Sequence, residues 1–319
     1  MKKKLLGASF AAFTALMLAA CGGTDNANDN KGTGGKENNN AAAATYEPEE
    51  LRVQFIPSQN AETLEATAKP LENLLSKELG IPVKVSVSTD YSAVTTALGA
   101  KQIDVGYLPP NAYVEAKKQG YAEVLLQSQR FGVNPEDGSE TDELVDSYKA
   151  QIVVRADSDI KSVEDLKGKT IAFQNATSAG GYVWPAATML DAGVDPQTDV
   201  NPVVLQGHDA ALLALLNGEV EAATTFHDAR NLLKKEFPNV FDDLRILTTT
   251  EDIPNDTVSV RADMSDEWKK KISDAFIALG EDEEGSKIIY EIYTHRGYTP
   301  SKDSNFDIVR EYADRIQQN

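Results

Sequence analysis

Short apolar runs alternate with amphipathic stretches along most of the chain. Apolar side chains dominate residues 51–56 and 83–87, and between these runs Leu64, Ala68 and Leu71 recur at intervals of four and three residues. Runs of that length are typical of buried strands, and that spacing places one apolar face on a helix. Strands that alternate with helices predict an α/β fold with mostly parallel sheets.

The strand–helix pattern occurs twice along the chain. A first set of strands is expected at 51–56, 83–87 and 103–107, and a second set at 169–173, 202–205 and 220–226. Polar turns and helices follow the strands of both sets in the same order. Few residues are identical between the two halves, so what repeats is the order of strands, turns and helices and not the residues themselves. A long-period repeat of this kind predicts two similar lobes.

The chain is expected to cross between these lobes twice. A strand at 151–154 opens the second lobe, and the segment 253–256 returns the chain to the first. We therefore expect residues 49–150 and 254–319 to form lobe 1 and residues 151–253 to form lobe 2. Two lobes joined by a double hinge can close on a ligand.

The N-terminal residues have the pattern of a secretory signal. Three lysines precede an apolar run that ends in Leu18-Ala19-Ala20-Cys21, and Cys21 is the single cysteine of the chain. This ending resembles a bacterial lipobox, in which the cysteine is lipidated; the plainer alternative is a small-residue cleavage site beside a chance cysteine. We expect a signal peptide at 1–20 and a flexible tether, rich in Gly and Asn, at 21–48.

Composition and charge exclude several functional classes. The chain has 319 residues, with 31 basic and 50 acidic side chains and a formal net charge of −19. That charge disfavours nucleic acid as a partner, because phosphates need a basic surface. One cysteine cannot form an internal disulfide. The sequence also lacks the glycine-rich nucleotide loops, the His-Glu-x-x-His metal motif and the Gly-x-Ser-x-Gly nucleophile motif. We therefore expect no cofactor, no metal site and no catalysis.

Polar residues follow the expected strands of both lobes. In open α/β sheets, ligands bind beyond the carboxyl ends of the strands. The six expected ends lie at 58–60, 89–91, 109–111, 175–181, 207–208 and 226–228. If the two lobes face each other, all six ends converge on one cleft, and that cleft is the expected ligand site.

The segment 177–182 is the most informative of these strand ends. It places two hydroxyls and two glycines at the start of a helix. Glycines let the backbone approach a ligand closely, and the N–H groups at a helix start favour an anion. A capped helix start with a flexible loop explains this segment equally well when it is considered alone. Together with the other five ends, the segment favours an anion site.

Three further side chains at these ends each allow two interpretations. Tyr91 can donate its phenol to an anion or can cover a surface of its lobe. His208 can donate an N–H to an anion, although a lone histidine is more often a capping or surface residue. Asp228 can cap a helix, or it can face a ligand amine or a protonated oxyanion.

These motifs together resemble those of the substrate-binding lipoproteins of phosphate, phosphite and phosphonate ABC importers, the PhnD-like family. The resemblance runs from about Leu51 to the C-terminus. It is carried by Val87-Ser88-Thr89-Asp90-Tyr91, 178–185, Gly207-His208-Asp209-Ala210, 216–222 and Ile253-Pro254-Asn255-Asp256. It implies a periplasmic-binding-protein fold of the double-hinge class (type II), with an anion held between the lobes.

The resemblance also implies which residues hold the ligand. Tyr91, Ser178, His208 and Asp228 match the positions that hold the oxyanion in the family. The family's Ser-Thr-Ser-Gly loop becomes Ser178-Ala179-Gly180-Gly181 here, so two of three hydroxyls are absent, and we expect Thr177 to compensate. The complete set of expected ligand residues is Ser58, Gln59, Tyr91, Asn111, Thr177, Ser178, Ala179, Gly180, Gly181, Tyr182, His208 and Asp228.

The function implied by the resemblance is that of a transport receptor. We expect a monomeric, extracytoplasmic protein, lipid-anchored to the membrane at Cys21, that binds phosphonate, phosphite or phosphate by lobe closure. Its expected partners are the permease and ATPase subunits of an ABC importer. The alternatives are the same fold with another small ligand, such as a cofactor precursor, a lipid-anchored enzyme, and a surface sensor or adhesin.

Overall fold

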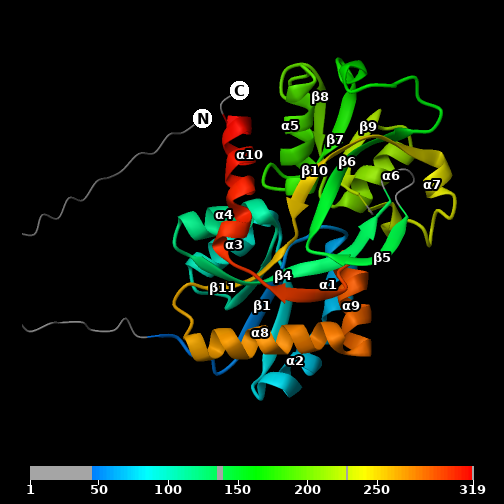
Figure 1. Ribbon diagram of the computed structural model, residues 1–319. Helices are drawn as coiled ribbons and strands as arrows, with labels where there is room; N and C mark the ends of the chain where they lie inside the picture. The colour runs from blue at the N-terminus through cyan, green and yellow to red at the C-terminus, as the bar shows by residue number, and fades with distance from the viewer. Residues whose placement is uncertain (1–44, 135–138, 228, 318–319) are drawn as a thin grey trace, which may run out of the picture. The chain divides into compact units, whose positions relative to one another are not determined.

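The computed structural model describes residues 45–134, 139–227 and 229–317. The expected signal peptide, the lipidation site Cys21 and most of the expected tether lie outside these ranges, as does the expected ligand residue Asp228. The described chain builds two separate mixed sheets, which lie one beyond the other in Figure 1.

The first sheet collects strands from distant parts of the chain. Its order is β12-β4-β11-β3-β1-β2, and β5 pairs with β4 outside this path. We call this sheet, with the helices packed on it, lobe 1. Its strands are β1 (Leu51–Phe55), β2 (Val83–Val87), β3 (Val105–Leu108), β4 (Ala122–Val133), β5 (Glu140–Val145), β11 (Thr257–Arg261) and β12 (Gly297–Pro300).

The second sheet is built from one continuous stretch of chain, and we call it, with its helices, lobe 2. Its order is β10-β6-β9-β7-β8. The strands are β6 (Ser147–Arg155), β7 (Thr170–Phe173), β8 (Asn201–Val204), β9 (Ala222–Phe226) and β10 (Leu244–Pro254). The chain enters this sheet at β6 and leaves it after β10. The two crossings lie side by side, since the N–H of Asn255 donates to the carbonyl of Asp146 at 2.9 Å.

Parallel pairing is confined to the repeated unit of each lobe. Strands β2-β1-β3 and β8-β7-β9 pair in parallel, and their order around the central strand is the same in both lobes. The other strand pairs of the described chain are antiparallel, among them β11 with β3 and β6 with β9. The expectation of mostly parallel sheets is therefore wrong outside these triplets. Strands β6 and β11 run against the repeat because each enters its sheet from the hinge.

Helices connect the strands and cover the sheets. Pro70 lies between α1 and α2, where a residue without an N–H cannot continue a helix. In lobe 1 the helices are α1 (Ala61–Ala68), α2 (Leu71–Leu79), α3 (Tyr91–Gly99), α4 (Pro110–Lys118), α8 (Asp266–Glu281), α9 (Glu283–Tyr293) and α10 (Asp307–Gln317). In lobe 2 they are α5 (Trp184–Asp191), α6 (His208–Leu216) and α7 (Val240–Asp243).

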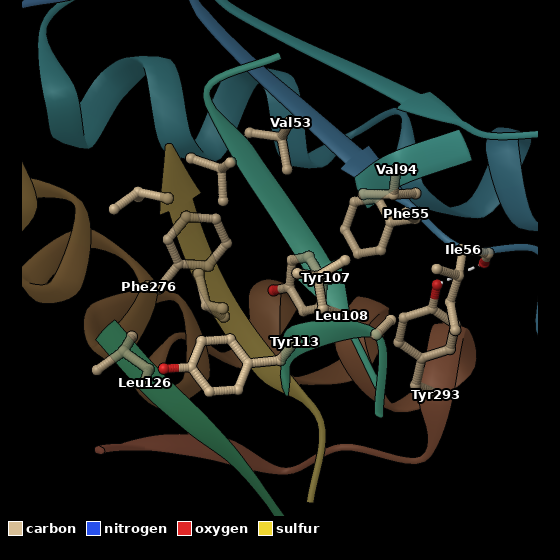
Figure 2. Close-up of a cluster of buried hydrophobic side chains, with 14 of the residues drawn as sticks. Val53, Phe55, Ile56, Val94, Tyr107, Leu108, Tyr113, Leu126, Phe276 and Tyr293 are labelled. Carbon is tan, nitrogen blue, oxygen red and sulfur yellow. Dashed lines mark hydrogen bonds between the residues drawn. The ribbon is translucent and has the colours of Figure 1, made fainter. Parts of the chain in front are cut away.

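An aromatic cluster forms the core of lobe 1 beneath the end of β1 (Figure 2). Phe55 stacks on Tyr107 with ring centroids 4.2 Å apart, and Phe276 of α8 meets the Tyr107 ring edge-on at 5.8 Å. The phenol of Tyr293 donates a hydrogen bond of 2.6 Å to the carbonyl of Ile56. Ile56, the residue that follows β1, is thereby fixed to α9. It anchors the segment that leads to Ser58 and Gln59.

The last helix packs on both lobes. Helix α10 contacts α4 of lobe 1 and α5 of lobe 2. Tyr312 of α10 stacks on Trp184 of α5, with ring centroids 4.4 Å apart and planes 8° from parallel. The guanidinium of Arg315 pairs with the carboxylate of Asp191 at 2.6 Å. Trp184 is fully buried, so its surroundings depend on how the two lobes meet.

Candidate functional site

Polar side chains from both lobes surround one small cavity at the carboxyl ends of the strands. Its interior leaves about 30 Å³ for the centres of water molecules, room for roughly two or three waters. Five of the expected ligand residues line it: Ser58, Gln59 and Tyr91 from lobe 1, and Ser178 and His208 from lobe 2. The fold thus brings together residues that are far apart in the sequence.

Tyr91 is positioned by the cap of α3. Its neighbour Asp90 accepts hydrogen bonds from the hydroxyl of Ser92 at 2.7 Å and from the N–H groups of Ser92 and Ala93. These bonds lower the pKa of Asp90. Tyr91 itself is only 3% exposed, and burial raises the pKa of its phenol. The phenol therefore keeps its proton at neutral pH and can donate it in a hydrogen bond.

Ser178 lies at the start of a π-helical turn over Ala179–Val183. Its hydroxyl oxygen accepts a hydrogen bond from the N–H of Gly181 at 3.1 Å. The carbonyl of Gly181 accepts bonds from the N–H of Gln174 at 3.1 Å and from the hydroxyl of Thr224 at 2.6 Å. The turn is thus fastened to both β7 and β9, and Ser178 is held against the cavity. Single π turns are frequent at functional sites.

His208 joins the two lobes through its backbone and faces the cavity with its ring. Its N–H donates to the carbonyl of Ser58 at 2.9 Å, and its Nδ1 lies 2.8 Å from the hydroxyl of Thr225. The ring also meets Phe226 edge-on at 4.7 Å. Burial lowers the pKa of His208 to about 3. The imidazole is therefore neutral at physiological pH, and it offers one N–H and one lone pair.

The buried histidine predicts a specific pH dependence of stability. In the unfolded chain a histidine titrates near pH 6.5, whereas burial favours the neutral ring in the folded protein. This stabilising contribution is complete above about pH 6.5 and is lost as the pH falls towards 3. Between about pH 7.5 and 5, wild type should lose about 2 kcal/mol more free energy of unfolding than His208→Asn. Urea titrations at both pH values measure the difference, and equal losses in the two proteins would contradict it.

Four polar residues that line the cavity were absent from the expected set: Arg130, Tyr148, Asp256 and Tyr293. Arg130 lies on β4 and Tyr148 on β6, close to the crossings between lobes. Burial raises the phenol pKa of both tyrosines, and the nearby Asp256 carboxylate adds to that effect. The sequence pattern assigned no strand to the β4 region, and it placed Asp256 at the hinge. A signal was present only for Asp256, in the motif Ile253-Pro254-Asn255-Asp256.

Several expected ligand residues lie elsewhere. Asn111, Thr177 and Tyr182 line a different hollow, beside α4 and α10. The hydroxyl of Thr177 donates to Oδ1 of Asn175 at 2.9 Å, so the structure does not place it where it could replace the missing hydroxyls.

Other expected residues are near the cavity but offer it no side-chain donor. Ala179, Gly180 and Gly181 form the buried turn behind Ser178. The amide of Gln59 donates to the carbonyls of Glu291 and Ile292, so its side-chain nitrogen is engaged with α9. Besides Gln59, the expected residues that line the cavity with polar side chains are Ser58, Tyr91, Ser178 and His208.

In the ranges 45–134, 139–227 and 229–317, no three His, Cys, Asp or Glu side chains are grouped so that they could hold a metal ion. Over the same described chain, no helix is both long enough and apolar enough to cross a membrane.

Comparison with known proteins identifies the family. The family model of the periplasmic substrate-binding proteins of phosphonate ABC transporters matches residues 53–306. The phosphate-import protein PhnD of Mycolicibacterium smegmatis is 28% identical over 227 residues, which are 69% of this chain and 64% of that protein. The chain thus spans just under two thirds of the length of that relative. The phosphonates-binding periplasmic protein of Escherichia coli is 24% identical over 276 residues, 85% of this chain and 78% of that protein.

A solved structure confirms the fold. PhnD1 of Prochlorococcus marinus, in complex with methylphosphonate, superposes with a TM-score of 0.73 at 18% identity and covers 86% of this chain and all of that one. The expected two-lobed fold of the double-hinge class is therefore confirmed. These relatives are substrate-binding proteins of transporters and not enzymes, as the sequence predicted. With its match from residue 53 to residue 306, the chain belongs to the family of periplasmic substrate-binding proteins of phosphonate ABC transporters.

Proposed function

We propose that this protein is the extracytoplasmic receptor of an ABC importer and that it holds a phosphorus oxyanion in the cavity between its lobes. The observation that carries the proposal is the cavity itself. Tyr91 of lobe 1 and Ser178 and His208 of lobe 2 surround it, so one small ligand can bridge both lobes. The names of the relatives associate them with phosphate, phosphonates and methylphosphonate, which supports this ligand class.

Hydrogen-bond donors hold the oxyanion in this proposal. Hydroxyls of Tyr91 and Ser178 and one N–H of the neutral His208 ring donate to its oxygens, and the guanidinium of Arg130 adds a positive charge. In a site closed to water, hydrogen bonds to a charged oxygen are stronger than those between neutral groups. The net charge of −19 does not oppose binding, because exposed charges beyond a Debye length are screened.

Asp256 favours an oxyanion that carries a hydrogen. Its side chain is 16% exposed and lines the same cavity. A carboxylate repels an anionic ligand beside it unless the ligand donates a hydrogen bond to the carboxylate. Phosphate and phosphonate keep a P–OH over part of the neutral pH range, whereas sulfate has none to offer. This residue therefore supports discrimination against sulfate.

Closure of the lobes and attachment to the membrane complete the proposal. Three hydrogen bonds join the two lobes: the N–H of His208 donates to the carbonyl of Ser58, Nε2 of Gln206 donates to the carbonyl of Thr89 at 2.7 Å, and the N–H of Asn60 donates to the carboxylate of Asp209 at 3.2 Å. We propose that these bonds form when the lobes close on the ligand and break when they open. Lipidation of Cys21 would keep the receptor beside its permease.

Calorimetric titration tests the ligand class directly. Phosphate, phosphite and methylphosphonate should each be titrated into the purified protein, with sulfate as the control anion. At least one phosphorus oxyanion should bind at least about 100-fold more tightly than sulfate, because sulfate leaves the Asp256 carboxylate without a hydrogen bond. Absence of binding to all three phosphorus anions would overturn the proposed function.

The same titration can report the movement of the lobes. The sequence has two tryptophans, so Trp268→Phe leaves Trp184 as the sole tryptophan. Trp184 lies between the lobes against Tyr312, and lobe closure should therefore change its emission on addition of the ligand. Binding heat without any change in emission would contradict the closure that we propose.

A further inference from the structure

A buried guanidinium forms part of the cavity wall. Arg130 is 4% exposed and lies on β4, the strand next to the crossings between lobes. Its guanidinium carbon lies 4.8 Å from the ring centroid of Tyr148 and 5.5 Å from that of Phe226, and its Nη2 donates to Oδ1 of Asn255 at 3.1 Å. Contacts with lobe 2 and with the hinge thus hold the permanent positive charge of this lobe 1 residue at the cavity.

The cavity leaves little room beyond a tetrahedral group. Its interior leaves about 30 Å³ for the centres of water molecules, which is room for roughly two or three waters. Two or three waters occupy roughly the volume of one phosphate or methylphosphonate ion. The apolar side chains of Ile56, Phe226 and Ile292 form other parts of the wall. A ligand with a longer arm would have to keep the lobes apart or displace these side chains.

We infer that Arg130 determines specificity and restricts the ligand to a small oxyanion without a cationic arm. This inference rests on the proposed function. The guanidinium attracts a second negative charge of the ligand and repels an ammonium group held in the same closed space. The Asp256 carboxylate also faces the cavity, but an ammonium arm long enough to reach past the phosphorus group exceeds the space available. Charge and volume therefore act in the same direction.

Two phosphonates of equal size separate charge from volume. Ethylphosphonate and aminomethylphosphonate have the same number of heavy atoms, and they differ by a methyl group in place of an ammonium. Wild type should bind ethylphosphonate at least about tenfold more tightly. Methylphosphonate should bind more tightly than propylphosphonate by a similar factor, because of the limited volume. Titrations over a range of pH separate the ionisation of the phosphonate group from the effect of the amine.

Variants of Arg130 test whether this residue is the cause. In Arg130→Met, the ratio of the affinities for ethylphosphonate and aminomethylphosphonate should fall to about one. The affinity of this variant for methylphosphonate should fall about tenfold. Arg130→Lys keeps the charge and should retain the ratio. Each ratio compares two ligands on one protein, so a partly destabilised variant still gives a valid result.

The outcomes distinguish the inference from the function on which it rests. Failure of every phosphonate and of phosphate to bind wild type would overturn the proposed function and the inference together. If phosphonates bind, but aminomethylphosphonate binds as tightly as ethylphosphonate, only the inference is overturned. A ratio that persists in Arg130→Met would likewise show that another group excludes the ammonium.

Discussion

Gly181→Ala should destabilise the protein by about 3 kcal/mol and abolish tight ligand binding. A methyl group at this position would overlap Cβ and Cγ of Gln174 and lie 2.9 Å from the hydroxyl oxygen of Ser178. Gln174 is 1% exposed, so its side chain is enclosed by other atoms of the protein. Overpacking of this severity costs about 1–3 kcal/mol or more. To relieve the overlap with Gln174, the turn that holds Ser178 would have to open.

A second glycine provides the matched control. Gly297 lies on β12, and a methyl group there would meet only Oε1 of Gln129, at an ordinary 3.6 Å. Gly297→Ala should therefore change the free energy of unfolding by less than about 0.5 kcal/mol and leave affinity unchanged. Denaturant titration and calorimetry measure both quantities. Wild-type affinity in Gly181→Ala would show that the turn does not position the ligand donors.

Gly207→Ala should lower ligand affinity roughly 100-fold. The backbone of Gly207 has φ of +100°, and a methyl group there would overlap the carboxylate of Asp209 and lie 3.2 Å from Cα of Gln59 in the opposite lobe. The Asp209 carboxylate also accepts the interlobe bond from Asn60. Crowding that costs about 1–3 kcal/mol, together with the loss of that bond, would raise the free energy of the closed form relative to the open form.

Backbone strain needs a separate control, because a positive φ disfavours alanine in any lobe arrangement. Gly168 has φ of +75° and no atom within 4 Å of the position that its Cβ would occupy. Gly168→Ala should therefore lower stability by about 1–2 kcal/mol without changing affinity. Comparison of Kd and unfolding free energy for the two variants separates strain from closure. Equal affinities in Gly207→Ala and Gly168→Ala would argue against closure at this contact.

Local sequence rules predicted the repeated half of each lobe well. The strands β1, β2 and β3 and their counterparts β7, β8 and β9 follow from short apolar runs, and the polar residues after them follow from the geometry of parallel sheets. Tyr91, Ser178 and His208 were found by that rule. These elements were predictable because their signals lie within a few residues of each other.

The missed residues depend on pairing across long distances in sequence. Strand β4 pairs with β11 and β12, more than a hundred residues later, so its own sequence does not reveal its neighbours. Arg130 was missed with that strand. Thr177 shows a different limit: it is adjacent to Ser178, but its hydroxyl turns to Asn175, and sequence spacing does not determine that direction.

The order of strands in lobe 1 also constrains how the protein is made. Strand β11 lies between β3 and β4 in the sheet, although it is formed by residues 257–261. Until that segment has been synthesised, β3 and β4 have no common neighbour, and the sheet remains two fragments with open edges. Lobe 2 is continuous from β6 to β10 and meets no such delay. Synthesis of lobe 1 therefore begins before that of lobe 2, and its sheet is completed last. Its exposed strand edges are the part of the nascent chain most in need of protection from aggregation.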